Sequence, residues 1–262
     1  MRKLTLLLLL LLPFTSCRDE RRGHQSTSVL FVGNSLTYVG NLPAVFEAIA
    51  GQNQHPTHTD MIVSGGATLT QRVADQSVAA ALESTHYDYV VFQERGGDAL
   101  CSFGPESCKD FNTSLLALAK VARENHVSAV LLGTYQGNPE PSAALVNAEG
   151  LAAQRAGIPY LAVSELLLKG RTQIHDCQWF YTDGMHPGHG LVLLNSLLLY
   201  KHIYGSWSLP SSVVVNAPMY VPGTKFKPPA PVSHAIGAEM TEQTYSYGEQ
   251  CVRQIAALAK KS

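Results

Sequence analysis

The sequence SVLFVGNS at residues 28–35 decides the fold. Its uninterrupted apolar run from Val29 to Val32 is typical of a strand that is buried on both faces of a sheet. Gly33 permits a sharp exit from that strand, so Ser35 is expected where the strand ends. The stretch therefore predicts a core parallel strand with a hydroxyl group at its carboxyl end.

Four more short apolar runs and five helical stretches follow this strand. The runs lie at residues 61–63, 89–92, 129–132 and 160–163. The helical stretches lie at residues 42–50, 69–82, 111–126, 142–156 and 190–203. Short strands that alternate with helices indicate a parallel sheet covered on both faces, with ligand sites at the carboxyl ends of the strands. We therefore predict an α/β domain, a three-layer α/β/α sandwich with a five-stranded parallel sheet.

The N-terminal residues do not fit this pattern. Arg2 and Lys3 precede a leucine-rich run that Pro13 breaks, which predicts a signal peptide over residues 1–16. The run is too short for a membrane-spanning helix of about 20 residues. The sequence that ends at Cys17 resembles a bacterial lipobox, so Cys17 is a predicted lipidation site. An ordinary cleavage site with an incidental cysteine is the alternative.

The rest of the chain is predicted to be a tether, over residues 17–27, and a single domain, over residues 28–262. A segment rich in Pro and Ser, residues 206–231, is expected to wrap the surface of the domain, and residues 239–260 are expected to form a final helix. The formal net charge is -1 and no basic stripe occurs, so we expect no nucleic-acid partner. Membrane contact is expected only through a lipid anchor at Cys17.

The cysteines are typical of an exported protein. Beyond Cys17 there are Cys101, Cys108, Cys177 and Cys251, which allow three pairings. We favour Cys101–Cys108, because the two flank one short loop, and Cys177–Cys251, which would tie the C-terminal segment to the body. No CxxC or clustered Cys/His spacing indicates a metal, and no phosphate loop, dinucleotide fingerprint or HExxH motif occurs, so we expect no metal and no cofactor.

Two motifs carry the chemistry. Ser35 follows the first strand, and the loop of residues 181–187 holds Asp183 and His186 three positions apart. A carboxylate that binds one nitrogen of an imidazole fixes its tautomer and stabilises the imidazolium that forms during turnover. A lone serine after a strand is usually a turn residue, and a lone DxxH is a weak signal. Together they supply a nucleophile, a base and an orienting acid.

These motifs resemble those of the SGNH hydrolase superfamily. Gly33-Asn34-Ser35-Leu36 is similar to its GDSL block, with Asn34 in place of Asp, and the sequence DGMHP at residues 183–187 is similar to its DxxHP block. The resemblance covers residues 28 to about 204. It implies a flavodoxin-like fold, with Ser35 as the nucleophile and Asp183 and His186 completing the triad.

The resemblance also implies an oxyanion hole. The backbone N–H of Ser35 is one expected donor, and the family's second block supplies a glycine, for which Gly66 fits best and Gly65 is the alternative. The family's third block offers an Asn, but here Gln93 is the only amide after the third strand. We predict that Gln93 takes this role.

Several other residues near these motifs receive weaker assignments. Glu94 and Asp98 are expected to be solvated loop acids, and Thr37 and Tyr38 are candidates to line the pocket. His189 lies three residues beyond the predicted base, but it does not complete the DxxH spacing, so it is not assigned as the base.

The predicted function is hydrolysis of a carboxylic ester through an acyl-enzyme. The resemblance and the exported position favour short acyl esters, among them acetyl esters of carbohydrate, in the periplasm or cell envelope. A lipid ester or thioester, as a lysophospholipase cleaves, is the alternative substrate class. A non-catalytic surface binding protein on an esterase scaffold is the alternative outside enzymes, because a fold does not fix a function.

Overall fold

The computed structural model describes residues 26–136, 139–208, 212–226, 231–233 and 244–261. The predicted signal peptide, Cys17 and the tether up to residue 25 lie outside the described residues. None of the described helices combines the length and the apolar character that crossing a membrane requires.

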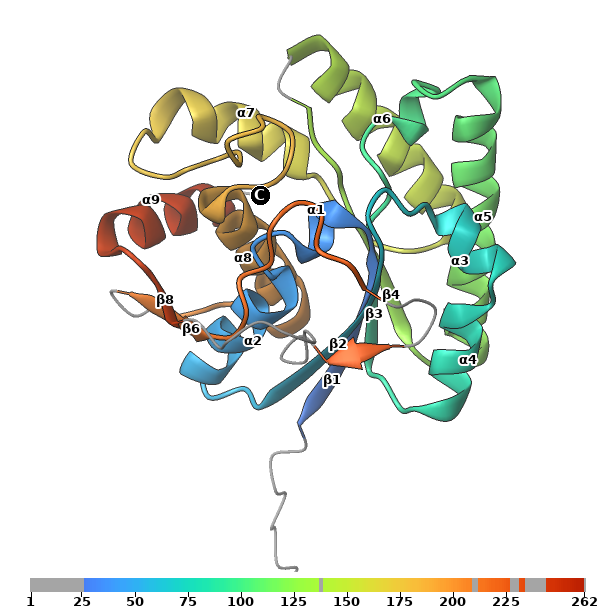
Figure 1. Ribbon diagram of the computed structural model, residues 1–262, viewed down its shortest axis with the longest axis horizontal. Helices are drawn as coiled ribbons and strands as arrows, with labels where there is room; N and C mark the ends of the chain where they lie inside the picture. The colour runs from blue at the N-terminus through green and yellow to red at the C-terminus, as the bar shows by residue number, and fades with distance from the viewer. Residues whose placement is uncertain (1–25, 137–138, 209–211, 227–230, 234–243, 262) are drawn as a thin grey trace, which may run out of the picture.

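A central sheet carries the site. Its parallel strands are β1 (Thr27–Gly33), β2 (Thr57–Val63), β3 (Tyr89–Phe92), β4 (Ser128–Leu132) and β5 (Tyr160–Leu161). The spatial order is β5-β4-β3-β1-β2-β7, in which β7 (Val232–Ser233) pairs antiparallel with β2 at the edge (Figure 1). The five predicted parallel strands are confirmed. Strand β7 was not predicted, because two residues beside a Pro-rich segment carry no strand pattern.

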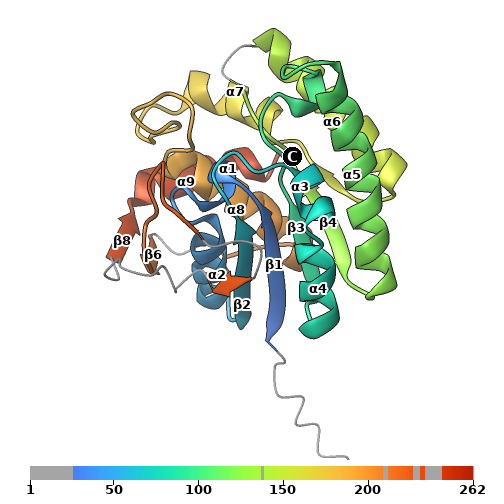
Figure 2. The ribbon, with the colours of Figure 1, turned by 45° about the vertical axis from the view of Figure 1, so that its right-hand side comes forward.

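Helices cover both faces of the sheet, as predicted (Figures 1 and 2). One layer holds α2 (Leu42–Gln52), α7 (Val163–Gln173), α8 (His189–Tyr204) and α9 (Glu249–Ala259). The other layer holds α3 (Leu69–Ala74), α4 (Ser77–Ser84), α5 (Pro105–Glu124) and α6 (Pro139–Ala156). Each layer packs its apolar side chains against one face of the sheet in a separate buried cluster. Because β1 contributes to both clusters, its continuous apolar run is explained.

Three predicted helix and strand bounds are wrong. The helix over residues 69–82 is two helices, because Gln76 adopts a left-handed φ of 56° between α3 and α4. The last strand ends at Leu161, and α7, which was not predicted, begins at Val163.

The third error lies near the C-terminus. The expected final helix begins only at Glu249, because Thr244–Tyr247 forms β8, which pairs antiparallel with β6 (Val213–Asn216). Residues 239–243 of that expected helix lie outside the described residues. In β8, Tyr247 is buried and alternates with exposed Ser246, which is a strand pattern rather than a helical one. The strand β6 falls within the segment that was expected only to wrap the surface.

Both favoured disulfides are present. Cys101 and Cys108 are bonded, with their Cα atoms 4.7 Å apart, and join the loop after β3 to the first turn of α5. Cys177 and Cys251 are bonded, with Cα atoms 5.5 Å apart, and join the segment after α7 to α9. The second disulfide therefore ties the C-terminal helix to the body of the domain.

Candidate active site

Ser35 lies at the carboxyl end of β1, as the first residue of the short helix α1 (Ser35–Tyr38). Gly33 must be a glycine here, because a Cβ atom would lie 2.1 Å from Thr37 Oγ1. Asn34 caps α1 by accepting a hydrogen bond from Leu36 N at 3.0 Å. The Asn34 amide also donates to the backbone oxygen of Ala67 at 3.1 Å. Asn34 therefore fixes both the turn that presents Ser35 and the neighbouring loop.

That neighbouring loop, between β2 and α3, carries Gly66. Its φ of 67° lies in the left-handed region, which glycine adopts without strain. Within the described residues, no hydrogen bond uses the backbone N–H of Ser35 or Gly66. Two backbone donors on adjacent strand ends are thus available to an anion at this edge of the sheet.

Gln93 follows β3 and is buried, with 1% of its surface exposed. Its side-chain oxygen accepts a hydrogen bond from Thr37 Oγ1 at 2.7 Å. Its amide nitrogen donates to Gly133 O over 3.5 Å, a long contact. The side chain therefore links α1, the end of β3 and the end of β4, and its role as an oxyanion donor stays a prediction.

Asp183 and His186 form a compact pair in the loop before α8. Asp183 Oδ2 lies 2.6 Å from His186 Nδ1, and Asp183 Oδ1 accepts hydrogen bonds from the N–H groups of His186 and Met185 at 3.0 and 2.9 Å. Burial raises the pKa of Asp183, but these donors outweigh it and lower the pKa to about 2. A charged carboxylate thus holds the imidazole with Nε2 available for proton transfer.

One cavity of about 380 Å³ brings the main candidates together. It is lined by Asn34, Ser35, Leu36, Gly66, Arg95, Gly96, Phe103, Tyr135, Gln136, Phe180, Gly184, Met185 and His186. A larger cavity of about 650 Å³ beside β5 and α7 contains none of the predicted site residues. The smaller cavity is therefore the candidate active site.

Other predicted residues lie outside this lining. Gly65 does not line the cavity, so of the two glycines Gly66 is the one placed beside Ser35. Thr37 and Tyr38, expected as candidates to line the pocket, are each only 1% exposed and do not line it. His189 lies on the other side of the loop, stacked on Tyr245 with ring centroids 3.8 Å apart.

The hydrogen bond between Ser35 and His186 that proton transfer requires is not formed in the described part of the molecule. Catalytic hydrogen bonds often tighten only when substrate is bound. Ser35 and His186 line the same cavity. The mechanism requires that Ser35 Oγ and His186 Nε2 approach to hydrogen-bond distance when substrate binds.

Glu94 and Asp98, expected to be solvated, are buried instead, at 1% and 3% exposed. Glu94 accepts hydrogen bonds from Leu69 N at 3.1 Å and Arg95 N at 2.8 Å. Burial raises the pKa of Glu94 to about 8, although both N–H donors lower it. Asp98 accepts two hydrogen bonds, each 2.8 Å long, from the guanidinium of Arg95. Both acids therefore organise the loop after β3.

Sequence reasoning missed part of the cavity wall, including Arg95, Phe103 and Tyr135. Arg95 and Tyr135 come shortly after β3 and β4, where the strand pattern already placed the site, so their positions carried a usable signal. Phe103 carried none, because it lies eleven residues beyond the end of its strand at Phe92 and reaches the cavity only through the path of the loop. Among the described residues, no three His, Cys, Asp or Glu side chains are grouped so as to hold a metal ion.

Comparison with known proteins identifies the fold. No protein-family model and no curated protein matches the sequence. A candidate SGNH hydrolase from Slackia heliotrinireducens is similar in structure, with a TM-score of 0.54 and 21% identity, covering 68% of this chain and 98% of that chain. An acetyl xylan esterase from Geobacillus stearothermophilus has a TM-score of 0.57 at 12% identity, covering 71% and 100%. A psychrotrophic esterase from Pseudoalteromonas sp. has a TM-score of 0.53 at 17% identity, covering 68% and 97%. The chain has the fold of SGNH hydrolases and esterases.

Proposed function

We propose that this protein is a carboxylic ester hydrolase with Ser35 as its nucleophile. The observation that carries the proposal is the single cavity that holds Ser35, Gly66 and His186, with His186 Nδ1 bound to the Asp183 carboxylate. The fold shared with esterases supports the same reaction class. A binding protein would not need a serine, an imidazole and a charged carboxylate in this chain order.

The reaction proceeds in two steps. His186 Nε2 accepts the proton of Ser35 Oγ as that oxygen attacks the ester carbonyl, and the N–H groups of Ser35 and Gly66 bind the oxyanion, with Gln93 as the proposed third donor. The tetrahedral intermediate collapses and the alcohol leaves with the proton from His186. A water molecule, deprotonated by His186, then attacks the acyl-enzyme; the carboxylic acid leaves and His186 returns the proton to Ser35 Oγ, while Asp183 holds the imidazole throughout.

Acetyl esters of carbohydrate are one proposed substrate class, supported by the acetyl xylan esterases among the structurally similar proteins. The alternative, a lipid ester or thioester, is supported by the cavity itself. Its volume of about 380 Å³ exceeds the needs of an acetyl group, and Leu36, Phe180 and Met185 give it an apolar wall.

The two disulfides support export to an oxidising compartment, where such bonds form and persist. Retention in the periplasm or cell envelope by a lipid at Cys17 is a proposal that rests on the sequence alone. Palmitate labelling of the wild type, compared with Cys17→Ser, is the direct test.

Hydrolysis of p-nitrophenyl acetate, butyrate and octanoate tests the function. Ser35→Ala is expected to lower kcat/KM by at least about 10³-fold, because the nucleophile is lost while the fold is kept. Ser84→Ala, at the end of α4 and outside the cavity, is the matched control. Absence of any Ser35-dependent hydrolysis across the three esters would contradict the proposal and favour the binding protein.

A further inference from the structure

Phe103 is an unusual residue for the rim of an open cavity. It is a large aromatic side chain with 56% of its surface exposed, and it lines the cavity that holds Ser35 and His186. Exposed apolar surface beside a cleft is typical of a place where a ligand binds, because contact with the ligand removes that surface from water.

The ring of Phe103 is held in place from one side by Arg95. The guanidinium carbon of Arg95 lies 3.7 Å from the centre of the ring, within the range of a cation–π contact. Arg95 is fixed in turn by two hydrogen bonds of 2.8 Å to Asp98, whose carboxylate is buried. The bidentate pair leaves the guanidinium little freedom, so the ring that packs on it is also restrained.

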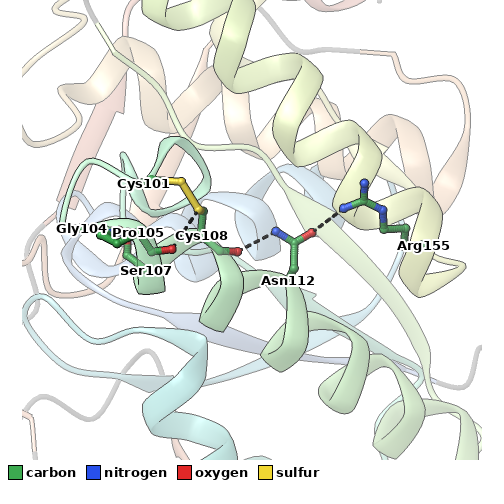
Figure 3. Close-up of a disulfide and its surroundings, with 7 residues drawn as sticks. All are labelled: Cys101, Gly104, Pro105, Ser107, Cys108, Asn112 and Arg155. Carbon is green, nitrogen blue, oxygen red and sulfur yellow. Dashed lines mark hydrogen bonds between the residues drawn. A yellow bond between two sulfur atoms is a disulfide. The ribbon is translucent and has the colours of Figure 1, made fainter.

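The backbone that carries Phe103 is restrained from the other side by the disulfide Cys101–Cys108. Cys101 adopts a left-handed φ of 56°, which costs energy for a residue with a side chain and needs support from its surroundings. Figure 3 shows that support: the disulfide leads to the first turn of α5, where Asn112 donates to Cys108 O at 2.6 Å and Arg155 of α6 donates to Asn112 at 3.1 Å.

A disulfide and a partly buried ion pair therefore hold an exposed ring at the cavity. A second exposed apolar side chain, Met185, lines the same cavity with 65% of its surface exposed, beside His186. Leu36 and Phe180 add further apolar side chains to the lining of the cavity. Together these side chains offer a hydrocarbon surface that an acetyl group is too small to cover.

We propose that Phe103 is a specificity-determining residue that packs on an apolar acyl group longer than acetyl, and that Cys101–Cys108 fixes it for this role. The inference rests on the proposed esterase function and names its substrate class. The disulfide is then part of the binding apparatus rather than a general staple of the fold.

The size of the effect follows from the buried surface. Removing the ring leaves in water the part of the bound acyl chain that the ring would cover, and we expect this loss of apolar contact to lower kcat/KM about tenfold. On this proposal an acetyl group is too short to pack on the ring, so the rate with the acetate ester is expected to stay within about twofold.

The test compares p-nitrophenyl acetate and octanoate with the full-length protein. Phe103→Ala is expected to lower kcat/KM for octanoate about tenfold, mainly through KM, and to leave acetate unchanged. Phe103→Trp is expected to restore octanoate. Cys101→Ser/Cys108→Ser is expected to reproduce the selective loss, because the loop that positions Phe103 is released. Leu116→Ala on α5, which removes an exposed leucine outside the cavity, controls for surface hydrophobicity.

The outcomes separate this inference from the function on which it rests. If neither ester is hydrolysed in a Ser35-dependent way, the esterase function fails and this inference fails with it. If Ser35-dependent hydrolysis is present but Phe103→Ala changes acetate and octanoate equally, or changes neither, the function stands and the role of Phe103 is overturned. A selective loss in Phe103→Ala that is absent from the double cysteine variant overturns the role of the disulfide alone.

Discussion

The two halves of the candidate site are built in opposite ways. The half that carries Ser35 is a buried network on strand ends, in which Asn34 and Gln93 are each 1% exposed and bond across neighbouring strands. The half that carries His186 is a surface loop, in which the side chains of Asp183 and His186 are 37% and 17% exposed. Hydrogen bonds between residues far apart in the chain hold the half with Ser35, whereas hydrogen bonds within one loop hold most of the half with His186.

The loop half is nevertheless well defined. Asp183 accepts from two N–H groups of its own loop, and Tyr181 N donates to His186 O at 2.8 Å across the loop's base. The two halves therefore differ in whether a substitution alters the rate alone or the rate together with folding. Changes in the loop half should alter the rate with little effect on folding, because few buried contacts depend on it. Changes in the strand half should alter both.

The largest effect is expected from Asp183→Asn. The variant keeps the shape of the side chain but removes the charge that stabilises the imidazolium and favours the opposite tautomer of His186. We expect kcat to fall by about 10³- to 10⁴-fold while the protein stays folded and its melting temperature drops only slightly, because the side chain of Asp183 is 37% exposed. Steady-state kinetics and thermal unfolding of the same preparations measure both quantities.

Asp176→Asn provides the control, since Asp176 is an exposed carboxylate outside the cavity that bonds to Gln250. Because the pKa of Asp183 is lowered to about 2, its carboxylate stays charged at ordinary pH. An Asp183→Asn enzyme with wild-type kcat would remove Asp183 from the triad.

A smaller effect is expected in the strand half from Gln93→Ala. One oxyanion donor is worth about 10²- to 10³-fold in turnover, and this is the loss we expect if the Gln93 amide binds the oxyanion. The same side chain also accepts from Thr37, so its removal is expected to lower stability as well. Activity assays and denaturant unfolding measure the two effects separately.

Thr37→Val distinguishes the two roles of Gln93. It deletes the hydroxyl that Gln93 accepts from while leaving the amide N–H in place. If Thr37→Val loses as much turnover as Gln93→Ala, Gln93 acts by positioning β1 and not as a donor. If Gln93→Ala keeps full turnover, Gln93 has no part in the oxyanion hole.

The sequence could predict features whose determinants are local. The apolar run of β1 and the turn at Gly33 are each encoded within a few neighbouring residues, and so is the spacing of Asp183 and His186. The sheet and the layers were therefore predicted correctly in type and order, and the expected contact between Asp183 and His186 is present. The break between α3 and α4 was missed, because a left-handed residue at Gln76 has no sequence signal as clear as a glycine.

Features that depend on burial by segments distant in the chain could not be predicted from the sequence. Glu94 and Asp98 look like solvated loop acids along the chain and become buried only because α3, α5 and the returning loop close over them. Phe103 reaches the cavity because a disulfide and the Arg95–Asp98 pair direct its loop there. The path of a loop is a property of the whole fold, so no local pattern revealed these residues.

The two halves also differ in the direction of their carboxyl pKa values. In the loop half, N–H donors at the surface lower the pKa of Asp183 to about 2, although burial raises it. In the strand half, burial raises the pKa of Glu94 to about 8, although N–H donors lower it. Asp183 thus contributes stability above its unfolded pKa that is lost only as the pH falls through about 2. Glu94, whose pKa is raised, contributes stability at low pH that is lost as the pH rises through about 8.

The smallest effect is therefore expected from Glu94→Gln, seen as a change in the pH dependence of folding. Between the unfolded pKa of about 4.5 and the folded value of about 8, the folded chain holds one more proton than the unfolded chain, so stability falls as pH rises. Glutamine cannot ionise and resembles the protonated acid. The free energy of unfolding of the wild type, relative to Glu94→Gln, should fall by about 2 kcal/mol between about pH 5.5 and about pH 7.

Taking the difference between the two proteins removes the titration of every group that they share. Glu83→Gln, on the exposed side of α4, should give a curve parallel to that of the wild type. Parallel curves for the wild type and Glu94→Gln would mean that Glu94 is ionised in the folded protein at neutral pH. The N–H donors at Leu69 and Arg95 would then outweigh burial, and N–H donors would set the pKa of the carboxyl group in both halves.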